Sequence, residues 1–455
     1  MLNICFSTTY GWNPGDELIL AGVKNILTSI MDKKEMNFII YNRNPDIRSQ
    51  FKQIFKSSKV PGDFNLYEET GILESHLKFG MFDNSVKAEF DGSCLDWVIF
   101  AGTPEWSNGR CYDLYRIILN YNIPVMILGV GGGMDCFDDR FKEVIAKSKI
   151  LTVREETTKR ALEKEGFNPL YLSCPALLSA PDSKEKKIDV IGKIGLIYQA
   201  TVEETIIWNG CSQELYHYEM NLYRDIFVTY GERYEICLVC HYIDELPLAK
   251  RDFPEADVLY SYKAEDYVDI YRDFDMVIGP RVHGIGCAAS LLIPGIAILH
   301  DARGETCQGF LAELIDTSTT FDDCKKMIDK IINDPKKFND NLYAHKRKTF
   351  EVYKSLVKKG FMDPQVNYFN KIQDQTPEYD LKEIDFRLNL VEKLLDLDST
   401  LADKFHSKCE RHVYSKEMPE ELLITLEEEK EIELDLSNLI KEKCGNVYVD
   451  INRKR

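Results

Sequence analysis

The stretch DFDMVIGPRVHGIGCAASLLIPGIAILHDARG, residues 273–304, decides how the second half of this chain folds. Its apolar runs at 275–279 and 295–299 have the length of buried strands, and the small residues at 284–292 favour a helix between them. A strand, a helix and a second strand in this order form a parallel crossover unit. Residues 280–283 should then lie in the turn at the carboxyl end of the first strand, where open α/β sheets bind ligands.

The chemistry of this turn suits an anion. A helix that begins near Gly284 directs unpaired N–H groups and the positive end of its dipole into the turn. Arg281 adds a cation for a phosphate or carboxylate, and His283 exchanges a proton near neutral pH, although both residue types also occur as solvated or capping groups in loops. The spacing of Gly284, Gly286 and Ala289 fits a dinucleotide fingerprint as well. In that fingerprint the glycines follow the strand directly. Here the four residues 280–283 separate the strand from Gly284, which argues against a dinucleotide site.

The length and composition predict two packed domains in a soluble protein. The chain has 455 residues, too many for one ordinary core, and 44% of them are hydrophobic. The net charge of −18 disfavours nucleic acid and anionic membrane surfaces as partners. No apolar run reaches the roughly 18 residues of a membrane span, and the N-terminal stretch lacks the pattern of a signal peptide. We therefore expect a cytoplasmic protein.

The 13 cysteines are scattered along the chain, and several lie within apolar runs. This odd count fits reduced core thiols better than a disulfide framework. Zinc ligands could come from Cys237, Cys240 and His241. They could also come from Cys409 and His412, but the two groups lie far apart and lack the paired spacing of a zinc site. We therefore expect no metal.

Short apolar strands alternate with helices in both halves of the chain. The predicted strands are residues 2–7, 38–41, 96–100, 124–128, 150–153, 194–198 and 234–240, in addition to the two strands of the opening stretch. This alternation predicts an α/β fold with two Rossmann-like parallel-sheet domains that face each other. The expected domains are residues 1–182 and 183–362. Residues 363–455 should form a helical, charged extension, either as solvated helices on the body or as a surface for homo-oligomers.

Charged residues follow several of these strands. Asp16 opens the first predicted helix, Arg154 follows the strand at 150–153, and His241 follows the strand at 234–240. Because ligands of parallel sheets lie at the carboxyl ends of the strands, we expect these residues to face a ligand between the domains. A capping role for Asp16 and a core or surface position for His241 fit the sequence equally well.

Short motifs along the chain occur in a recognisable order. They are Asn13-x-Gly15-Asp16-Glu17; Val153-Arg154-Glu155-Glu156-Thr157 with Leu162 and Gly166; Pro175-Ala176; His241-x-x-Asp244; and Arg281-x-His283 with Pro294 and Asp301. In this order, over about residues 1–315, they resemble the polysaccharide pyruvyl transferase family. The resemblance implies a GT-B-like arrangement of the two domains. It also implies transfer of the pyruvyl unit of phosphoenolpyruvate to two hydroxyls of a sugar, which gives a cyclic ketal and phosphate.

The resemblance also implies roles for individual residues. His283 would be the general acid that protonates the methylene carbon of the donor, and Asp16 or Asp244 would accept the hydroxyl proton. No step needs a metal or an organic cofactor. The groups expected to bind the donor or line its site are Arg281, Arg154, Arg303, Gly284, His241 and Asn13.

Three departures from the family pattern concern the acceptor more than the donor. A family glycine pair is replaced by Ala101-Gly102-Thr103-Pro104-Glu105-Trp106, Arg303 stands where many members have lysine, and the C-terminal region is long. A sugar ring could stack on Trp106, with Glu105 binding its hydroxyls, or Trp106 could pack inward as a loop anchor.

Two other functions fit the same sequence. A GT-B-like glycosyltransferase would use the arginines to bind the diphosphate of a nucleotide sugar. A non-catalytic relative would keep the scaffold for binding or assembly, because a fold does not by itself determine a function.

Overall fold

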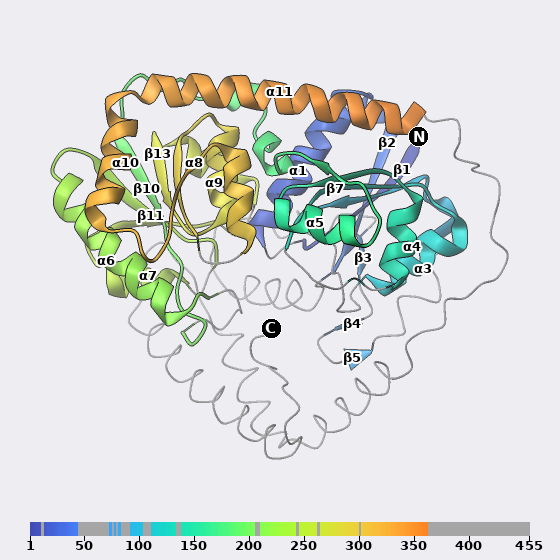
Figure 1. The fold of residues 1–455 in the computed structure, drawn as a ribbon, viewed down its shortest axis with the longest axis horizontal. Helices are drawn as coiled ribbons and strands as arrows, with labels where there is room; N and C mark the ends of the chain where they lie inside the picture. Colours follow the sequence, from blue (N-terminus) through green and yellow to red (C-terminus); the bar gives the residue numbers. More distant parts are fainter. Residues whose placement is uncertain are drawn as a thin grey trace, which may run out of the picture.

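The computed structural model contains two parallel β-sheets, each flanked by helices, and one long helix that crosses both (Figure 1). The structure describes residues 1–10, 13–43, 72–74, 77–78, 81–82, 92–102, 111–132, 137, 139–204, 210–242, 245–261, 264–299 and 302–362. The predicted α/β architecture with two parallel-sheet domains is confirmed.

The first sheet has the strand order β3-β2-β1-β6-β7-β8-β9 among the described residues. Its strands are β1 (Leu2–Thr8), β2 (Met36–Asn42), β3 (Ile72–Glu74), β6 (Trp97–Ala101), β7 (Val125–Val130), β8 (Ser148–Val153) and β9 (Leu170–Tyr171). Its helices are α1 (Pro14–Thr28), α3 (Tyr112–Tyr121), α4 (Asp139–Lys147) and α5 (Glu156–Lys164). Ile4 and Phe6 belong to one hydrophobic cluster and Cys5 to another, as expected when successive side chains of a strand point to opposite covered faces.

The second sheet has the strand order β12-β11-β10-β13-β14-β15 in the described part of the chain. Its strands are β10 (Lys193–Ile197), β11 (Glu235–Val239), β12 (Asp257–Leu259), β13 (Met276–Gly279), β14 (Gly295–Ile298) and β15 (Glu313–Ile315). Its helices are α6 (Gln213–Tyr230), α7 (Glu245–Asp252), α8 (Asp266–Arg272), α9 (Val282–Ser290) and α10 (Phe321–Asn333). In both sheets the strand order reverses beside the first strand of the domain, and such a reversal is where doubly wound folds bind ligands.

Smaller elements complete the description. The 3-10 helices are η1 (Lys33–Glu35), η3 (Gly92–Cys94), η4 (Pro175–Leu178), η5 (Asp182–Lys184) and η6 (Ala302–Phe310), and β4 (Leu77–Lys78) pairs with β5 (Met81–Phe82).

The helix α11 (Pro335–Met362) connects the two domains along one side of the molecule (orange in Figure 1). Near its start, Asn339 Nδ2 donates to the carbonyl oxygen of Leu292, 2.8 Å away, in the second domain. Near its end, the ring of Phe361 packs edge-on against Trp97 of the first sheet, with 4.8 Å between ring centroids. The last residues of the predicted second domain therefore also stabilise the first.

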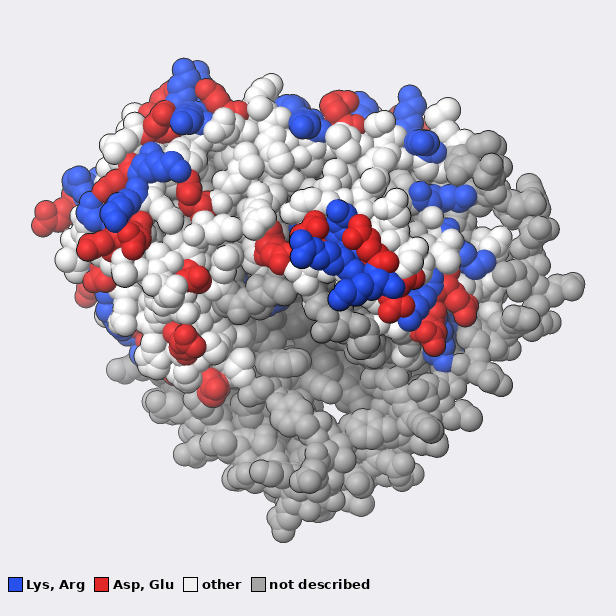
Figure 2. All heavy atoms as spheres, in the orientation of Figure 1, with Lys and Arg blue, Asp and Glu red and all other residues white. Residues whose placement is uncertain are grey.

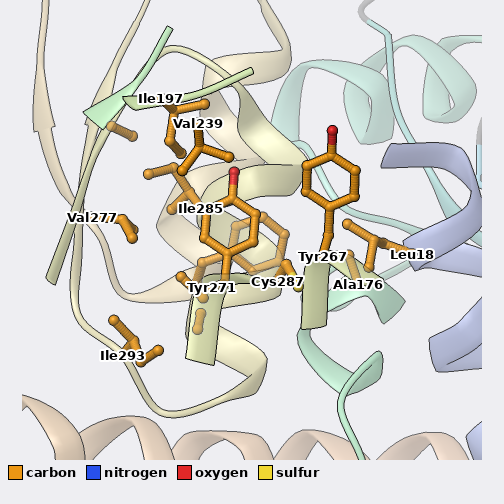
Figure 3. Close-up of a cluster of buried hydrophobic side chains, with 14 of the residues drawn as sticks. Leu18, Ala176, Ile197, Val239, Tyr267, Tyr271, Val277, Ile285, Cys287 and Ile293 are labelled. Carbon is orange, nitrogen blue, oxygen red and sulfur yellow. The ribbon is translucent and has the colours of Figure 1, made fainter. Parts of the chain in front are cut away.

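One hydrophobic core cluster continues from the first domain into the second. It includes Leu18 of α1 and Ala176 of η4 together with Ile285 and Cys287 of α9, which Figure 3 shows in one view. The starts of α1 and α9 are thereby held at the same boundary between the domains.

Two helices begin earlier than the sequence pattern predicts. The helix α9 begins at Val282 rather than near Gly284, because Arg281 is extended and its carbonyl oxygen already accepts from the N–H of Gly284 at 2.9 Å. His283 therefore lies in the first turn of a helix and not in a loop. The helix α1 begins at Pro14 rather than at Asp16, because Asn13 caps it and proline suits the first helical position.

Acidic and basic side chains intermix on the face of the molecule shown in Figure 2, most visibly over α5, where Lys159 and Arg160 pair with Glu156 and Glu163. Among the helices that the structure describes, none is both long and apolar enough to cross a bilayer.

The predicted acceptor residues Glu105 and Trp106, the predicted proton acceptor Asp244 and the predicted extension at 363–455 lie outside the described residues. Their roles stay predictions.

Candidate functional site

The candidate site lies where the first turns of α1 and α9 meet the carboxyl end of β8. His283 Nε2, in the first turn of α9, is 3.3 Å from Nη1 of Arg154, which directly follows β8. On the opposite side of the ring, a Cβ atom built on Gly15 of α1 would overlap Nδ1 of His283. The imidazole is therefore enclosed by groups from both domains.

The protonation state of His283 follows from these neighbours. Burial lowers the pKa of its imidazole well below the ordinary value, and the nearby cations Arg154 and Arg303 lower it further, as does His241. A guanidinium can only donate hydrogen bonds, so Nε2 of His283 accepts from Arg154. The neutral ring then carries its proton on Nδ1.

Arg154 is a buried cation that its neighbours hold in place. Its Nε lies 3.4 Å from Oε1 of Glu155, and its Nη1 lies 3.7 Å from Sγ of Cys174. Burial by itself lowers the pKa of Arg154, but Cys174, Glu155 and Asp16 raise it, and the net change is upward. Arg154 is therefore a permanent positive charge beside His283.

Glu155 is a buried residue beside Arg154 that sequence reasoning used only as part of a motif. Its carboxylate is fully buried and accepts from the N–H of Gly132 at 2.6 Å and from the hydroxyl of Thr158 at 3.0 Å. It also accepts from the hydroxyl of Thr306, 2.8 Å away in the second domain. The sequence did not indicate the contact between Glu155 and Thr306, because these two residues are 151 positions apart.

Arg281 is placed differently from its predicted role as an open cation for an anion. Its guanidinium forms an ion pair with the fully buried Glu245 and lies over the ring of Tyr242, 4.7 Å from the centroid. The other carboxylate oxygen of Glu245 accepts from the N–H groups of His241, at 2.9 Å, and Tyr242, at 3.1 Å. The charge of Arg281 is therefore compensated inside the second domain.

His241 and Gly284 face the protein interior. His241 Nε2 lies 2.7 Å from the hydroxyl of Tyr271, and burial, followed by the charge of Arg281, lowers the pKa of His241 well below its ordinary value. A Cβ atom on Gly284 would overlap the same Tyr271 hydroxyl. The geometry favours packing roles for both residues over contact with a ligand.

Asp16 lies on the first-domain side of the site. Its Oδ2 is 3.5 Å from Nη2 of Arg43 and 3.4 Å from Nδ2 of Asn13, and 19% of its side chain is exposed. Sequence reasoning did not single out Arg43, which lies two residues after the strand predicted at 38–41. Asn13 serves as the cap of α1, with Oδ1 accepting from the N–H of Gly15 at 3.0 Å.

Arg303 belongs to η6 and is exposed. It lies near enough to His283 to lower its pKa. The structure thus brings together His283, Arg154, Arg303 and Asp16, and it turns Arg281, His241 and Gly284 toward the interior of the second domain.

No group of three or more histidine, cysteine, aspartate or glutamate residues within the described ranges could hold a metal ion.

A family model and several solved structures resemble this chain. The model of the polysaccharide pyruvyl transferase family matches residues 13–302, which is more than half of the sequence. The chain belongs to the polysaccharide pyruvyl transferase family. The region matched by the family model contains the whole site apart from Arg303. No curated protein sequence matches the chain.

The similar solved structures have a GT-B-like fold and low sequence identity. The UDP-GlcNAc 2-epimerase from Neisseria meningitidis bound to UDP-GlcNAc is 12% identical with a TM-score of 0.47, over 78% of this chain and 99% of that one. The UDP-GlcNAc 2-epimerase from Methanocaldococcus jannaschii is 12% identical with a TM-score of 0.44, over 72% and 91%. The glycosyltransferase SnogD from Streptomyces nogalater is 11% identical with a TM-score of 0.44, over 79% and 100%.

The close approach of Gly15 to His283 predicts the effect of adding one methyl group. Gly15→Ala should lower the free energy of unfolding by about 1–3 kcal/mol, because the new methyl group would overlap the half-buried ring of His283, which also contacts Arg154 on its other nitrogen. In an unconstrained helix the same substitution gains up to about 1 kcal/mol. Urea unfolding measures the difference. In the control Gly192→Ala, the new Cβ meets its nearest atom, Oδ2 of Asp275, at an ordinary 3.4 Å. A Gly15→Ala protein as stable as wild type would contradict the contact.

Proposed function

We propose that this protein transfers the pyruvyl group of phosphoenolpyruvate to two hydroxyls of a sugar or glycan and forms a cyclic pyruvate ketal. The observation that carries the proposal is the contact between His283 and Arg154 across the domain boundary. Phosphoenolpyruvate bears a phosphate and a carboxylate, which need a fixed cation, and an enol carbon, which needs a proton. Arg154 would supply the cation and His283 the proton, and the two side chains are in hydrogen-bond contact.

The proposed reaction balances without a further reactant. A proton adds to the methylene carbon of phosphoenolpyruvate, one sugar hydroxyl attacks C2, phosphate leaves, and a second hydroxyl closes the ring. The two hydroxyls lose two protons in total. One of them balances the proton that was added to the methylene carbon, and the other leaves with the phosphate. In this proposal His283 delivers the first proton, and Asp16 of the first domain accepts one from a hydroxyl.

Arg154 and Arg303 are the cations we assign to the donor. Both act on the pKa of His283, and Arg154, although it also pairs with Glu155, contacts the imidazole directly, whereas Arg281 is turned to Glu245 of the second domain. A phosphate held by these two arginines would lie beside the imidazole. On the acceptor side, Asp244 keeps the role that the family resemblance implies, and Glu105 and Trp106 keep the sugar-binding roles predicted from their residue types. The cytoplasmic location and the homo-oligomer formed through 363–455 stay predictions.

The test of this function measures the donor and the product separately. Calorimetric titration with phosphoenolpyruvate measures donor binding, and incubation with a panel of methyl glycosides measures phosphate release and the methyl signal of the ketal by NMR. UDP release from UDP-glucose in place of ketal formation would favour a glycosyltransferase. A protein that binds neither phosphoenolpyruvate nor UDP-glucose would be a non-catalytic relative, and the proposal would be abandoned.

Donor binding is expected to take up a proton. His283 is neutral in the free protein because its pKa is lowered well below the ordinary value. The negative charges of phosphoenolpyruvate raise the pKa of this ring in the complex. Affinity should therefore fall as pH rises from the pKa of the free protein through the higher pKa of the complex. Calorimetry in two buffers of different ionisation enthalpy counts the protons, and an equal uptake by the His283→Gln protein would assign the proton to another group.

A further inference from the structure

A glycine loop at the end of β7 lies against the side chains that follow β8. Gly129 and Gly132 have positive φ angles of 72° and 114°, a backbone conformation that favours glycine. A Cβ atom built on Gly131, between them, would lie 2.3 Å from Oε1 of Glu155 and 2.5 Å from Nε of Arg154. Both distances are too short for any real contact, so the loop admits these two side chains only because it has no side chain here. We name Gly131, Gly132 and Glu155 the carboxylate cradle.

The carboxylate of Glu155 is fully buried, and donors from the loop, from α5, from η6 and from Arg154 surround it. Its Oε2 accepts from the N–H of Gly132 at 2.6 Å and from the hydroxyl of Thr158 at 3.0 Å. Its Oε1 accepts from the hydroxyl of Thr306 at 2.8 Å and from Nε of Arg154 at 3.4 Å. A buried carboxylate is tolerated when hydrogen bonds and a cation satisfy it in this way. With no exposed surface, Glu155 is placed to hold its neighbours and not to contact a substrate.

The cradle contacts one edge of the Arg154 guanidinium, and the other edge faces His283. The N–H of Arg154 donates to the carbonyl oxygen of Val130 at 2.9 Å, but a backbone hydrogen bond does not orient the side chain. Nη1 lies 3.3 Å from Nε2 of His283 and 3.7 Å from Sγ of Cys174. Burial raises the pKa of Cys174, so its thiol stays neutral and is a weak acceptor. Because the guanidinium is planar and rigid, the contact of Nε with Glu155 also sets the direction of Nη1.

We propose that the carboxylate cradle consists of positioning residues, which orient the guanidinium of Arg154 toward His283 and do not contact the donor themselves. The inference concerns the free protein, and it rests on the proposed function only where it speaks of phosphoenolpyruvate. Without the carboxylate, a buried guanidinium loses its counter-charge and turns toward water, away from the imidazole. The glycine loop is then a requirement of the site as well as of the turn after β7.

Two variants break the cradle in different ways. In Glu155→Gln the amide oxygen can still accept from the N–H of Gly132, and the NH2 group then faces Nε–H of Arg154, donor against donor. Gly131→Ala changes no charge, and its methyl group would overlap both Glu155 and Arg154. If Glu155→Gln does not fold, Gly131→Ala provides the same readouts.

The deciding experiment observes the imidazole of His283 by NMR of protein with isotope-labelled histidine, without any substrate. His283→Gln identifies the signal among the eight histidines of the chain. In wild type, Nε2 should show the nitrogen chemical shift of an acceptor that is hydrogen-bonded to Arg154. In Glu155→Gln and in Gly131→Ala, the shift should move toward that of an imidazole nitrogen without a donor. An unchanged shift in both variants would overturn the proposal.

The direction of the pKa change separates positioning from a simple charge effect. Burial lowers the pKa of His283 most, and the charged and titratable groups that lower it further are Arg154, Arg303 and His241. Glu155→Gln removes a negative charge, which by itself would lower the pKa of a nearby imidazole. Withdrawal of Arg154 has the opposite effect, so we expect the pKa to rise toward its ordinary value. A lower or an unchanged pKa would overturn the proposal.

Two control variants test for a general loosening. Thr158→Val removes one hydroxyl from Oε2 of Glu155 but keeps the oxygen that faces Arg154. Gly92→Ala creates a similar overlap elsewhere in the first domain, where the new Cβ would meet Cγ2 of Ile117 in α3 at 2.5 Å. Both should leave the nitrogen shift and the pKa of the imidazole unchanged. A change in either control as large as in the cradle variants would overturn the proposal.

A second measurement links the cradle to the donor. Phosphoenolpyruvate should bind about tenfold more weakly to Glu155→Gln and to Gly131→Ala, as for the loss of one charge-assisted contact, and with wild-type affinity to Thr158→Val. If wild-type protein does not bind phosphoenolpyruvate, the proposed function fails and the NMR of the free protein still decides the cradle. If wild type binds it and both cradle variants bind it equally well with an unchanged His283 signal, the cradle is wrong and the proposed function stands.

Discussion

Replacing His283 by glutamine is expected to lower kcat by about 100- to 10,000-fold while phosphoenolpyruvate binding survives. The amide oxygen of glutamine can accept from Nη1 of Arg154, as Nε2 of His283 does, so the cation stays in place. The amide cannot deliver a proton to the methylene carbon, so the chemical step is lost and the donor site remains.

Turnover and donor binding are measured on one preparation, by phosphate release and by calorimetry. The control is His217→Gln on the exposed face of α6, where the ring contacts only the carbonyl oxygen of Gln213 among the described hydrogen bonds. An equal loss of binding and turnover would give His283 a purely positional role. Unchanged turnover would remove it from the mechanism.

Glu245→Ala is expected to destabilise the protein by about 3–5 kcal/mol, because it leaves the guanidinium of Arg281 buried without its counter-charge. The substitution also removes the acceptor of the N–H groups of His241 and Tyr242. Glu245 links the turn after β11 to Arg281 at the start of α9, and the substitution would break this link. The effect is measured as the shift of the urea unfolding curve.

A surface ion pair provides the control. Glu313 pairs with Lys330, whose side chain is 60% exposed, and Glu313→Ala should cost less than about 1 kcal/mol. The double variant Glu245→Met with Arg281→Met should be more stable than Glu245→Ala, since it removes both buried charges. If Glu245→Ala proves no more costly than Glu313→Ala, the pair does not stabilise the domain.

The sequence pattern was most informative where buried strands are regular. The strand predicted at 150–153 is most of β8, and the strand predicted at 234–240 contains β11, Glu235–Val239. The pattern missed β12 and β15, which have three residues each, because so short a run shows no periodicity. It also missed α7, which has only eight residues.

By itself, the sequence determined the two parallel-sheet domains, the strand ends that carry the site, and the family. These follow from local periodicity and from residues close together in the chain. Only the tertiary structure decided that His283 meets Arg154, 129 positions away, and that Arg281 turns to Glu245. A side chain at a strand end can point toward a ligand or toward a neighbouring element. The choice depends on which charges burial brings near it, and residues distant in sequence supply those charges.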